Sequence, residues 1–199
     1  MLDADFFRRW MTATAASVDR EAQRLTALDS EIGDADHGIN MQRGFTAVTA
    51  ALEEEAPDTP GAVLVLAARQ LISKVGGASG PLYGTLLRRT GKELGDTAEV
   101  GEEQLAAALR EGVDAVMKLG GAAPGDKTMI DALVPAVDAL ADGFAAARAA
   151  AEQGAEATIP LQARKGRASY LGERSIGHQD PGATSSALLI AALEEAAEG

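Results

Sequence analysis

Hydrophobic positions recur every three or four residues along most of the chain. The first such stretch ends near Leu28 and carries one apolar stripe: Phe7, Met11, Ala15, Val18, Ala22, Leu25 and Leu28. This period is typical of an amphipathic α-helix. With glycine and proline taken as breaks, the same pattern predicts further helices over 39–55, 61–74, 81–95, 102–119, 127–148 and 160–170, with an interruption signal at Asp142-Gly143, and a last helix that begins after Asp180 and is rich in helix formers over 187–197.

The last helix has the clearest start signal. Asp180 followed by Pro181 is a typical N-cap and first-turn pair. The stretch 145–157 is rich in alanine, which indicates a solvated helix with a narrow buried stripe. In all we expect about eight helices.

Composition supports one all-α domain over 1–199. The 199 residues are 46% hydrophobic but 4% aromatic, which favours closely packed helices over strands, and no repeat or linker divides the chain. There is no cysteine, so a metal would need oxygen or imidazole ligands. Hard cations fit such ligands best.

The net charge of −12 makes direct binding of nucleic acid or of an anionic membrane unfavourable. The N-terminus lacks the basic start and apolar block of a signal peptide, and no apolar run approaches the length of a membrane span. The expected location is therefore the cytoplasm. A nucleotide would require a local reversal of the negative field, by cations, helix N-termini or arginines.

Polar residues and glycines concentrate in four loops, at 29–40, 76–80, 120–128 and 164–182. The first places Asp29, Asp34 and Asp36 within eight residues. Such crowding is costly unless it is neutralised, and Mg²⁺ takes carboxylate oxygens as ligands. The alternative is that these acids are helix caps and solvated loop residues. An EF-hand is a poor fit, because its regular aspartate frame is absent.

The glycine-rich loops precede helices. Residues 76–81 (GGASGP) would let backbone N–H groups approach an anion, although the loop lacks the ending of a Walker A motif. In the loop 120–129, Asp126 is a candidate cap and Met129 a candidate cover for a purine ring. For each loop, an ordinary tight turn or capped helix start remains the alternative.

The fourth loop is locally basic in an acidic protein. Arg164, Lys165, Arg167 and Arg174 lie within eleven positions, which is typical of a phosphate site or an acidic partner surface. A solvated charged face is the alternative. Residues 175–185 then lead into the last helix, whose free N–H groups could face a ribose or phosphate.

Taken together, these segments resemble the L subunit of bacterial dihydroxyacetone kinase from about Leu28 to Ser185. The matching strings, in the same order, are EIGDADHG at 31–38, GGASGPL at 76–82, PGDKTM at 124–129, ARKGRASYLGERS at 163–175 and DPG at 180–182. The resemblance implies a barrel of eight antiparallel helices with the nucleotide site at one end.

The resemblance also implies the ligands. ADP or ATP would be held through two Mg²⁺ by Asp29, Asp34 and Asp36. The nucleotide pocket would be formed by His37, Gly38, Ile39, Asn40, Ala78, Ser79, Gly120, Met129, Arg167, Asp180, Pro181 and Gly182.

By the same resemblance, a partner K subunit would hold dihydroxyacetone covalently, and this chain would present the γ-phosphoryl group. We therefore expect no covalent nucleophile here. The absence of a fused substrate domain resembles the phosphotransferase-dependent type, in which a phosphohistidine-carrying M subunit rephosphorylates bound ADP. An ATP-exchanging subunit for another ketose such as erythrulose, a regulatory module sensed by a transcriptional regulator, and a homodimer all remain open. A domain like that of fatty-acid kinases fits less well.

Overall fold

The computed structural model describes residues 1–199, and eight α-helices make up most of it. They are α1 (Ala4–Ile32), α2 (His37–Glu55), α3 (Pro60–Lys74), α4 (Ser79–Leu94), α5 (Glu102–Gly120), α6 (Ile130–Ala139), α7 (Phe144–Ala157) and α8 (Pro181–Glu198). Two 3₁₀ segments, η1 (Leu140–Asp142) and η2 (Arg167–Ser175), and two antiparallel strands, β1 (Leu2–Asp3) and β2 (Glu99–Val100), complete the chain. The all-α prediction is confirmed.

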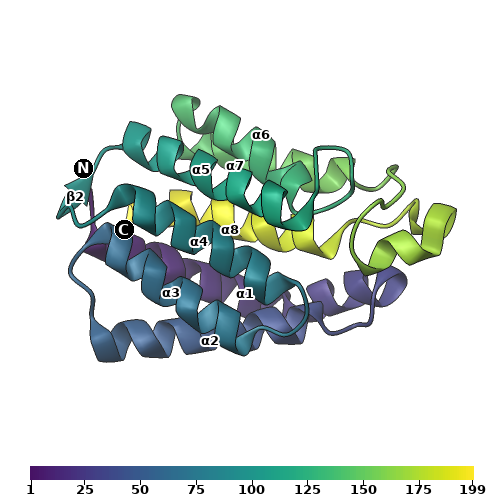
Figure 1. The fold of residues 1–199 in the computed structure, drawn as a ribbon, viewed down its shortest axis with the longest axis horizontal. Helices are drawn as coiled ribbons and strands as arrows, with labels where there is room; N and C mark the ends of the chain where they lie inside the picture. Colours follow the sequence, from purple (N-terminus) through teal and green to yellow (C-terminus); the bar gives the residue numbers. More distant parts are fainter.

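The helices form a closed ring. Each helix packs against the next one in sequence, and α8 packs back against α1. The helices run up and down along the long axis, with both termini at one end of the barrel (Figure 1). At the other end lie the α1–α2, α3–α4 and α5–α6 connections and the segment that precedes α8. This topology brings loops far apart in sequence to the same end of the barrel.

The inside of the ring is one continuous apolar core. Trp10 and Phe7 of α1 are fully buried, and the indole N–H of Trp10 donates to the Leu189 carbonyl of α8 at 2.8 Å. This bond satisfies the indole where the ring closes. Buried residues of α7 are Ala147, Ala151 and Ala155, four residues apart. The predicted alanine-rich helix with a narrow buried stripe is therefore confirmed.

Two helix predictions need correction. The first helix continues past Leu28 to Ile32, because Ile32 is buried and the first break is Gly33. Asp29 therefore lies in the last turn of α1. The predicted helix over 160–170 is wrong. Gly166, with φ of 64°, interrupts that stretch, which forms a loop and the first residues of the 3₁₀ segment η2.

Most other boundaries are close to the predictions, but the stretch predicted as a helix over 127–148 forms two helices, α6 and α7, and α7 continues to Ala157. The expected break at Asp142-Gly143 is present, since Gly143 has φ of 104° and separates α6 and η1 from α7. Asp180 caps α8 as predicted, accepting a hydrogen bond from the Ala183 N–H. Strands β1 and β2, which pair near the termini, were not predicted. Each is two residues long, too short to leave a pattern.

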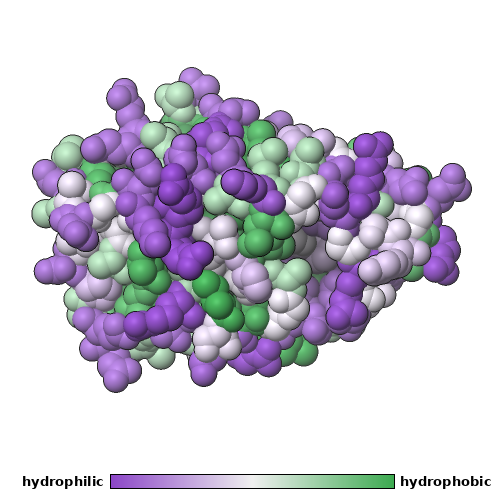
Figure 2. Space-filling model, in the orientation of Figure 1, coloured by the Kyte–Doolittle hydropathy of each residue, from purple (hydrophilic) through white to green (hydrophobic).

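Beyond the barrel, the last turn of α1 and segment η2 project side by side (Figure 1). Ile32, Ala163 and Ala168 are buried there in a small cluster apart from the core, with Leu171 packed against it. The face in Figure 2 is mostly hydrophilic, and its apolar side chains form small separate patches. None of the helices combines the length and apolar character that a membrane span requires.

Candidate functional site

A cavity of about 530 Å³ opens at the end of the barrel opposite the termini. All four polar loops contribute to its wall. Of the fifteen residues that the sequence analysis singles out, thirteen line it: Asp29, Asp34, Asp36, His37, Asn40, Ala78, Ser79, Gly120, Met129, Arg167, Asp180, Pro181 and Gly182. Gly38 and Ile39 do not line it. The volume is within the range of small-molecule sites.

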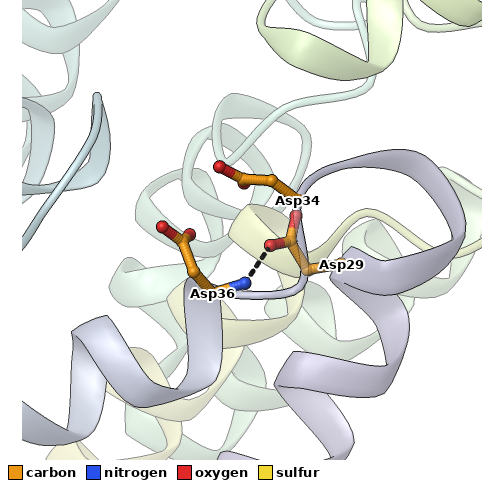
Figure 3. Close-up of side chains that lie close together, drawn as sticks. All are labelled: Asp29, Asp34 and Asp36. Carbon is orange, nitrogen blue, oxygen red and sulfur yellow. Dashed lines mark hydrogen bonds between the residues drawn. The ribbon is translucent and has the colours of Figure 1, made fainter.

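Three carboxylates form one wall of the cavity. Asp29, Asp34 and Asp36 each offer an oxygen within 4.8 Å of the others, and they converge at the turn between α1 and α2 (Figure 3). Asp29 is buried, and its Oδ2 accepts hydrogen bonds from the N–H groups of Asp36 (2.9 Å) and His37 (3.1 Å). Asp36 makes no side-chain cap to α2. Of the three aspartates, Asp29 therefore acts as a helix cap, which was the alternative to a metal site, while Asp34 and Asp36 are exposed.

The backbone explains this convergence. A Cβ on Gly33 would lie 2.0 Å from Asp29 Oδ1, so the carboxylate occupies the space that a side chain at 33 would fill. Ala35 has φ of 61°, a left-handed conformation that turns the chain tightly between Asp34 and Asp36. A Cβ on Gly38 would lie 1.9 Å from the Ala22 carbonyl oxygen, so Gly38 lets α2 approach α1 closely.

The donor set fits a hard divalent cation. Three carboxylates so close together repel one another, and Mg²⁺ would remove that repulsion while keeping coordination positions for phosphate or water. Arg167 Nη2 lies 3.0 Å from Asp34 Oδ2, which brings the basic segment to the acidic wall. Because both side chains are well exposed, this ion pair adds little stability by itself.

His37 connects the acidic wall to a buried hydroxyl network. Its Nδ1 lies 3.3 Å from Ser79 Oγ and its Nε2 lies 2.8 Å from Ser185 Oγ. The Tyr83 hydroxyl is 2.7 Å from Ser185 Oγ and 2.8 Å from Ser186 Oγ. Burial lowers the pKa of His37, although nearby Asp29 and Asp36 act in the opposite direction. Burial also raises the pKa of Tyr83, which keeps the phenol protonated.

The N-termini of helices α4 and α8 are among those that face the cavity. Helix α4 starts at Ser79 with no side-chain cap from Ala78, so its first amides are available to an anion. Helix α8 is capped by Asp180, whose Oδ2 accepts from the Ala183 N–H at 2.7 Å. Burial raises the pKa of Asp180 to about 7, even though that bond and the nearby Lys127 ammonium favour the ionised form. The two termini differ: α4 is open and α8 carries a carboxyl group.

The remaining wall is apolar. Leu82, Val116, Leu119 and Met129 line it, and they come from α4, the end of α5 and the residue before α6. Met129, the candidate cover for a purine ring, is buried and lines the cavity. The cavity thus has an acidic side, an amide-rich side and an apolar side.

The basic and second glycine-rich loops differ from the expectations in detail. Of the four basic residues, Lys165 and Arg167 line the cavity, whereas Arg164 and Arg174 do not. Asp126 does not cap a helix, because its Oδ2 accepts from the Ala123 N–H within the loop. Asp131, in the first turn of α6, accepts from the Thr128 N–H instead.

Sequence reasoning missed several residues of the wall, among them Tyr83, Lys127 and Thr128. Tyr83 looked like any apolar position of a helix. Lys127 and Thr128 lie within the string PGDKTM, which offered a signal, but the spacing alone does not indicate that a lysine is buried.

The chain is similar to known proteins over nearly all of its length. The profile of the DAK2 domain matches residues 31–195. The "PEP-dependent dihydroxyacetone kinase, ADP-binding subunit DhaL" of Escherichia coli K12 is 46% identical, over 95% of each chain. The L-erythrulose 1-kinase of Mycolicibacterium smegmatis is 42% identical, over 89% of this chain and 33% of that enzyme. The crystal structure of the dihydroxyacetone kinase from C. freundii in complex with AMP-PNP and Mg²⁺ matches with a TM-score of 0.76 and 29% identity, over 94% of this chain and 33% of that one.

Proposed function

Because the chain belongs to the DAK2 domain family, we propose that it is the nucleotide-carrying subunit of a dihydroxyacetone kinase. The observation that carries the proposal is the convergence of Asp29, Asp34 and Asp36 on a cavity whose other walls suit a nucleotide. The 46% identity to an ADP-binding subunit over nearly the whole chain supports the same assignment.

The bound ligands are ADP or ATP and two Mg²⁺. Asp29, Asp34 and Asp36 hold the metal ions, which when bound supply charge neutralisation to the phosphates. Arg167, beside Asp34, adds a guanidinium donor to the same phosphates, and the open amides of α4 contribute further donors. The apolar wall that includes Met129 would receive the adenine ring.

A partner K subunit supplies the ketose. Exposed large apolar side chains occur on the elements around the cavity, with exposed fractions of 57% for Ile39, 56% for Leu119 and 89% for Tyr170. Exposed apolar side chains around a polar cleft are typical of a protein-binding surface. They support docking of the K subunit over the cavity mouth, so that the γ-phosphoryl group faces the bound dihydroxyacetone.

This chain contributes to phosphoryl transfer by position and charge. The metal-binding carboxylates and Arg167 orient the phosphates, and docking excludes water from the reacting groups. The phosphoryl group is then restored on the bound ADP by a phosphohistidine-carrying M subunit, consistent with the phosphoenolpyruvate dependence in the name of the E. coli relative.

Reconstitution tests this proposal. The purified chain is combined with a K subunit and dihydroxyacetone, and then with either ATP or a phosphohistidine M subunit, while ³¹P NMR follows formation of dihydroxyacetone phosphate. Turnover with the M subunit alone supports the bound-coenzyme form. Turnover with ATP alone indicates an exchanging subunit, and no turnover with either overturns the kinase assignment in favour of a module sensed by a transcriptional regulator.

Erythrulose is a second candidate substrate. The L-erythrulose 1-kinase relative is 42% identical to this chain over about a third of its own length. Because the ketose is held by the K component, replacing dihydroxyacetone by L- or D-erythrulose in the same assay, with each candidate K subunit, identifies the substrate. Native mass spectrometry of the fresh protein is the direct test of the ligands, with retained ADP and two Mg²⁺ as the expected result.

A further inference from the structure

The segment between Ile159 and Gly177, which carries the basic residues of the fourth loop, begins and ends at almost the same point of the fold. The Gly177 N–H donates to the Ile159 carbonyl at 2.8 Å, which joins the two ends of the intervening segment. Between them, Lys165 and Arg167 reach the cavity. The position of a loop whose two ends meet in this way depends on the contacts that hold these ends, the base of the loop, together.

Lys127 lies at that base. Its side chain is buried, with 1% of the residue exposed, and its ammonium donates to the carbonyls of Thr158 (2.7 Å), Leu161 (3.1 Å) and His178, with Ile159 at 3.5 Å. An ammonium has three protons, so the four carbonyls occupy all of them. Although Lys127 borders the cavity, it cannot also bind a phosphate without releasing the loop.

Two further observations concern the surroundings of Lys127. Lys127 has φ of 63°, a left-handed conformation that is unfavourable for a lysine and persists where the surroundings demand it. The Thr158 hydroxyl accepts from the Asp180 N–H at 2.9 Å, so the same base also places the cap of α8. Asp180 and Asp131 are the carboxylates whose charges act on the ammonium.

We propose that Lys127 is a positioning residue, which closes the base of the basic loop and so places Arg167 opposite Asp34 at the nucleotide phosphates. Apart from this base, the loop is attached by the hydrogen bond from the Arg164 N–H to the Asp126 carbonyl (3.1 Å), by the small cluster around Ile32 and Ala168 and by the Arg167–Asp34 ion pair. The cluster has three buried residues and the ion pair is exposed, whereas the Lys127 bonds to the Thr158 and His178 carbonyls join the two ends of the loop. The role in nucleotide binding rests on the proposed function, whereas the ordering of the loop does not.

A double-mutant cycle tests whether Lys127 acts through Arg167. The dissociation constant of ADP with Mg²⁺ is measured by calorimetry for the wild type, Lys127→Met, Arg167→Ala and the double variant. Each single change is expected to weaken binding by about tenfold or more, and the double variant is expected to bind no more weakly than the worse single variant. Fold losses that multiply in the double variant overturn the proposal.

Hydrogen exchange tests the loop without any nucleotide. In Lys127→Met, the amides of Gly177 and Ala163, which close the loop, are expected to exchange about tenfold faster or more, while amides in the middle of α3 are unchanged. Equal acceleration in α3, or none at Gly177, contradicts a local role. Because this measurement needs no ligand, it separates failure of the loop proposal from failure of the proposed function.

The absence of cysteine permits a chemical rescue. The Lys127→Cys variant is alkylated while unfolded, either with 2-bromoethylamine, which restores an ammonium at nearly the lysine position, or with iodoacetamide, which adds a neutral amide. Both products are refolded beside wild type treated identically. The ammonium adduct is expected to recover slow exchange at Gly177 and the neutral adduct is not. If the ammonium adduct protects Gly177 no better than the neutral one, the proposal fails.

Discussion

His37 and Ser185 are 148 residues apart in sequence, yet His37 Nε2 lies 2.8 Å from Ser185 Oγ. The bond connects the first residue of α2, directly after the acidic turn, to the second turn of α8. Both side chains are buried, and the Tyr83 hydroxyl contacts the same serine. The position of the imidazole beside the cavity is thus set by a helix from the other end of the chain.

Ser185→Ala is therefore expected to affect both stability and binding. Loss of the hydroxyl leaves His37 and Tyr83 short of a partner and should lower the free energy of unfolding by about 1–3 kcal/mol. Nucleotide affinity should fall about fivefold, because the imidazole loses its anchor. Ser186→Ala is the matched control, since Ser186 contacts Tyr83 but not His37. Urea unfolding and calorimetry measure the two effects, and equal affinity losses in both variants would contradict the anchoring role.

Asp34→Asn is expected to abolish nucleotide retention. Loss of even an indirect metal contact commonly costs 10–100-fold in affinity, so removal of a ligand carboxylate should weaken binding of ADP with Mg²⁺ by at least about tenfold. Without Mg²⁺, the free energy of unfolding should change by less than about 1 kcal/mol, because the Asp34–Arg167 pair is exposed. Asp58→Asn, at an exposed position outside the cavity, is the control. Retention of ADP by Asp34→Asn in native mass spectra would argue against the metal site.

Gly33→Ala tests the geometry of the acidic turn without removing a charge. The new Cβ would lie 2.0 Å from Asp29 Oδ1, so the carboxylate has to move. Affinity for Mg²⁺ with ADP should fall about tenfold, through displacement of one ligand. Gly101→Ala is a matched control, because the Cβ it adds meets nothing closer than 3.6 Å. An unchanged affinity in Gly33→Ala would show that Asp29 is not needed in its observed position.

Asp180 is expected to make stability depend on pH. Its pKa in the folded chain is about 7, above the ordinary value of 3.8, because burial penalises the charged form. The native state then binds more protons than the unfolded state between these values. The stability that the neutral acid contributes is complete below about pH 4 and is lost as pH rises through 7, and it amounts to about 4 kcal/mol.

The Asp180→Asn variant isolates this effect, because asparagine still caps a helix but does not titrate. Urea unfolding in EDTA from pH 4 to pH 8 gives the difference in free energy of unfolding between wild type and variant. That difference should shift against the wild type as the pH rises. A difference that is constant with pH would show that Asp180 does not titrate in this range.

Local sequence determined most of the helices and the chemistry of the site. A period of 3.6 residues, proline at helix starts and glycine at breaks act within a few residues, so they can be read from the chain directly. The cap pair Asp180-Pro181 and the alanine stripe of α7 were predicted on this basis. The crowding of Asp29, Asp34 and Asp36 was likewise visible, because all three belong to one turn.

Tertiary structure decided what depends on contacts between distant segments. The stretch 160–170 has helix-forming residues, but the Lys127 ammonium holds the carbonyls of Thr158 and Leu161 at its start and Gly166 turns left-handed, so a helix does not form there. The burial of Lys127, the serine partner of His37 and the gathering of four loops at one end all arise from closure of the ring. Packing energies between residues far apart in sequence set these features, and no local period or spacing encodes them.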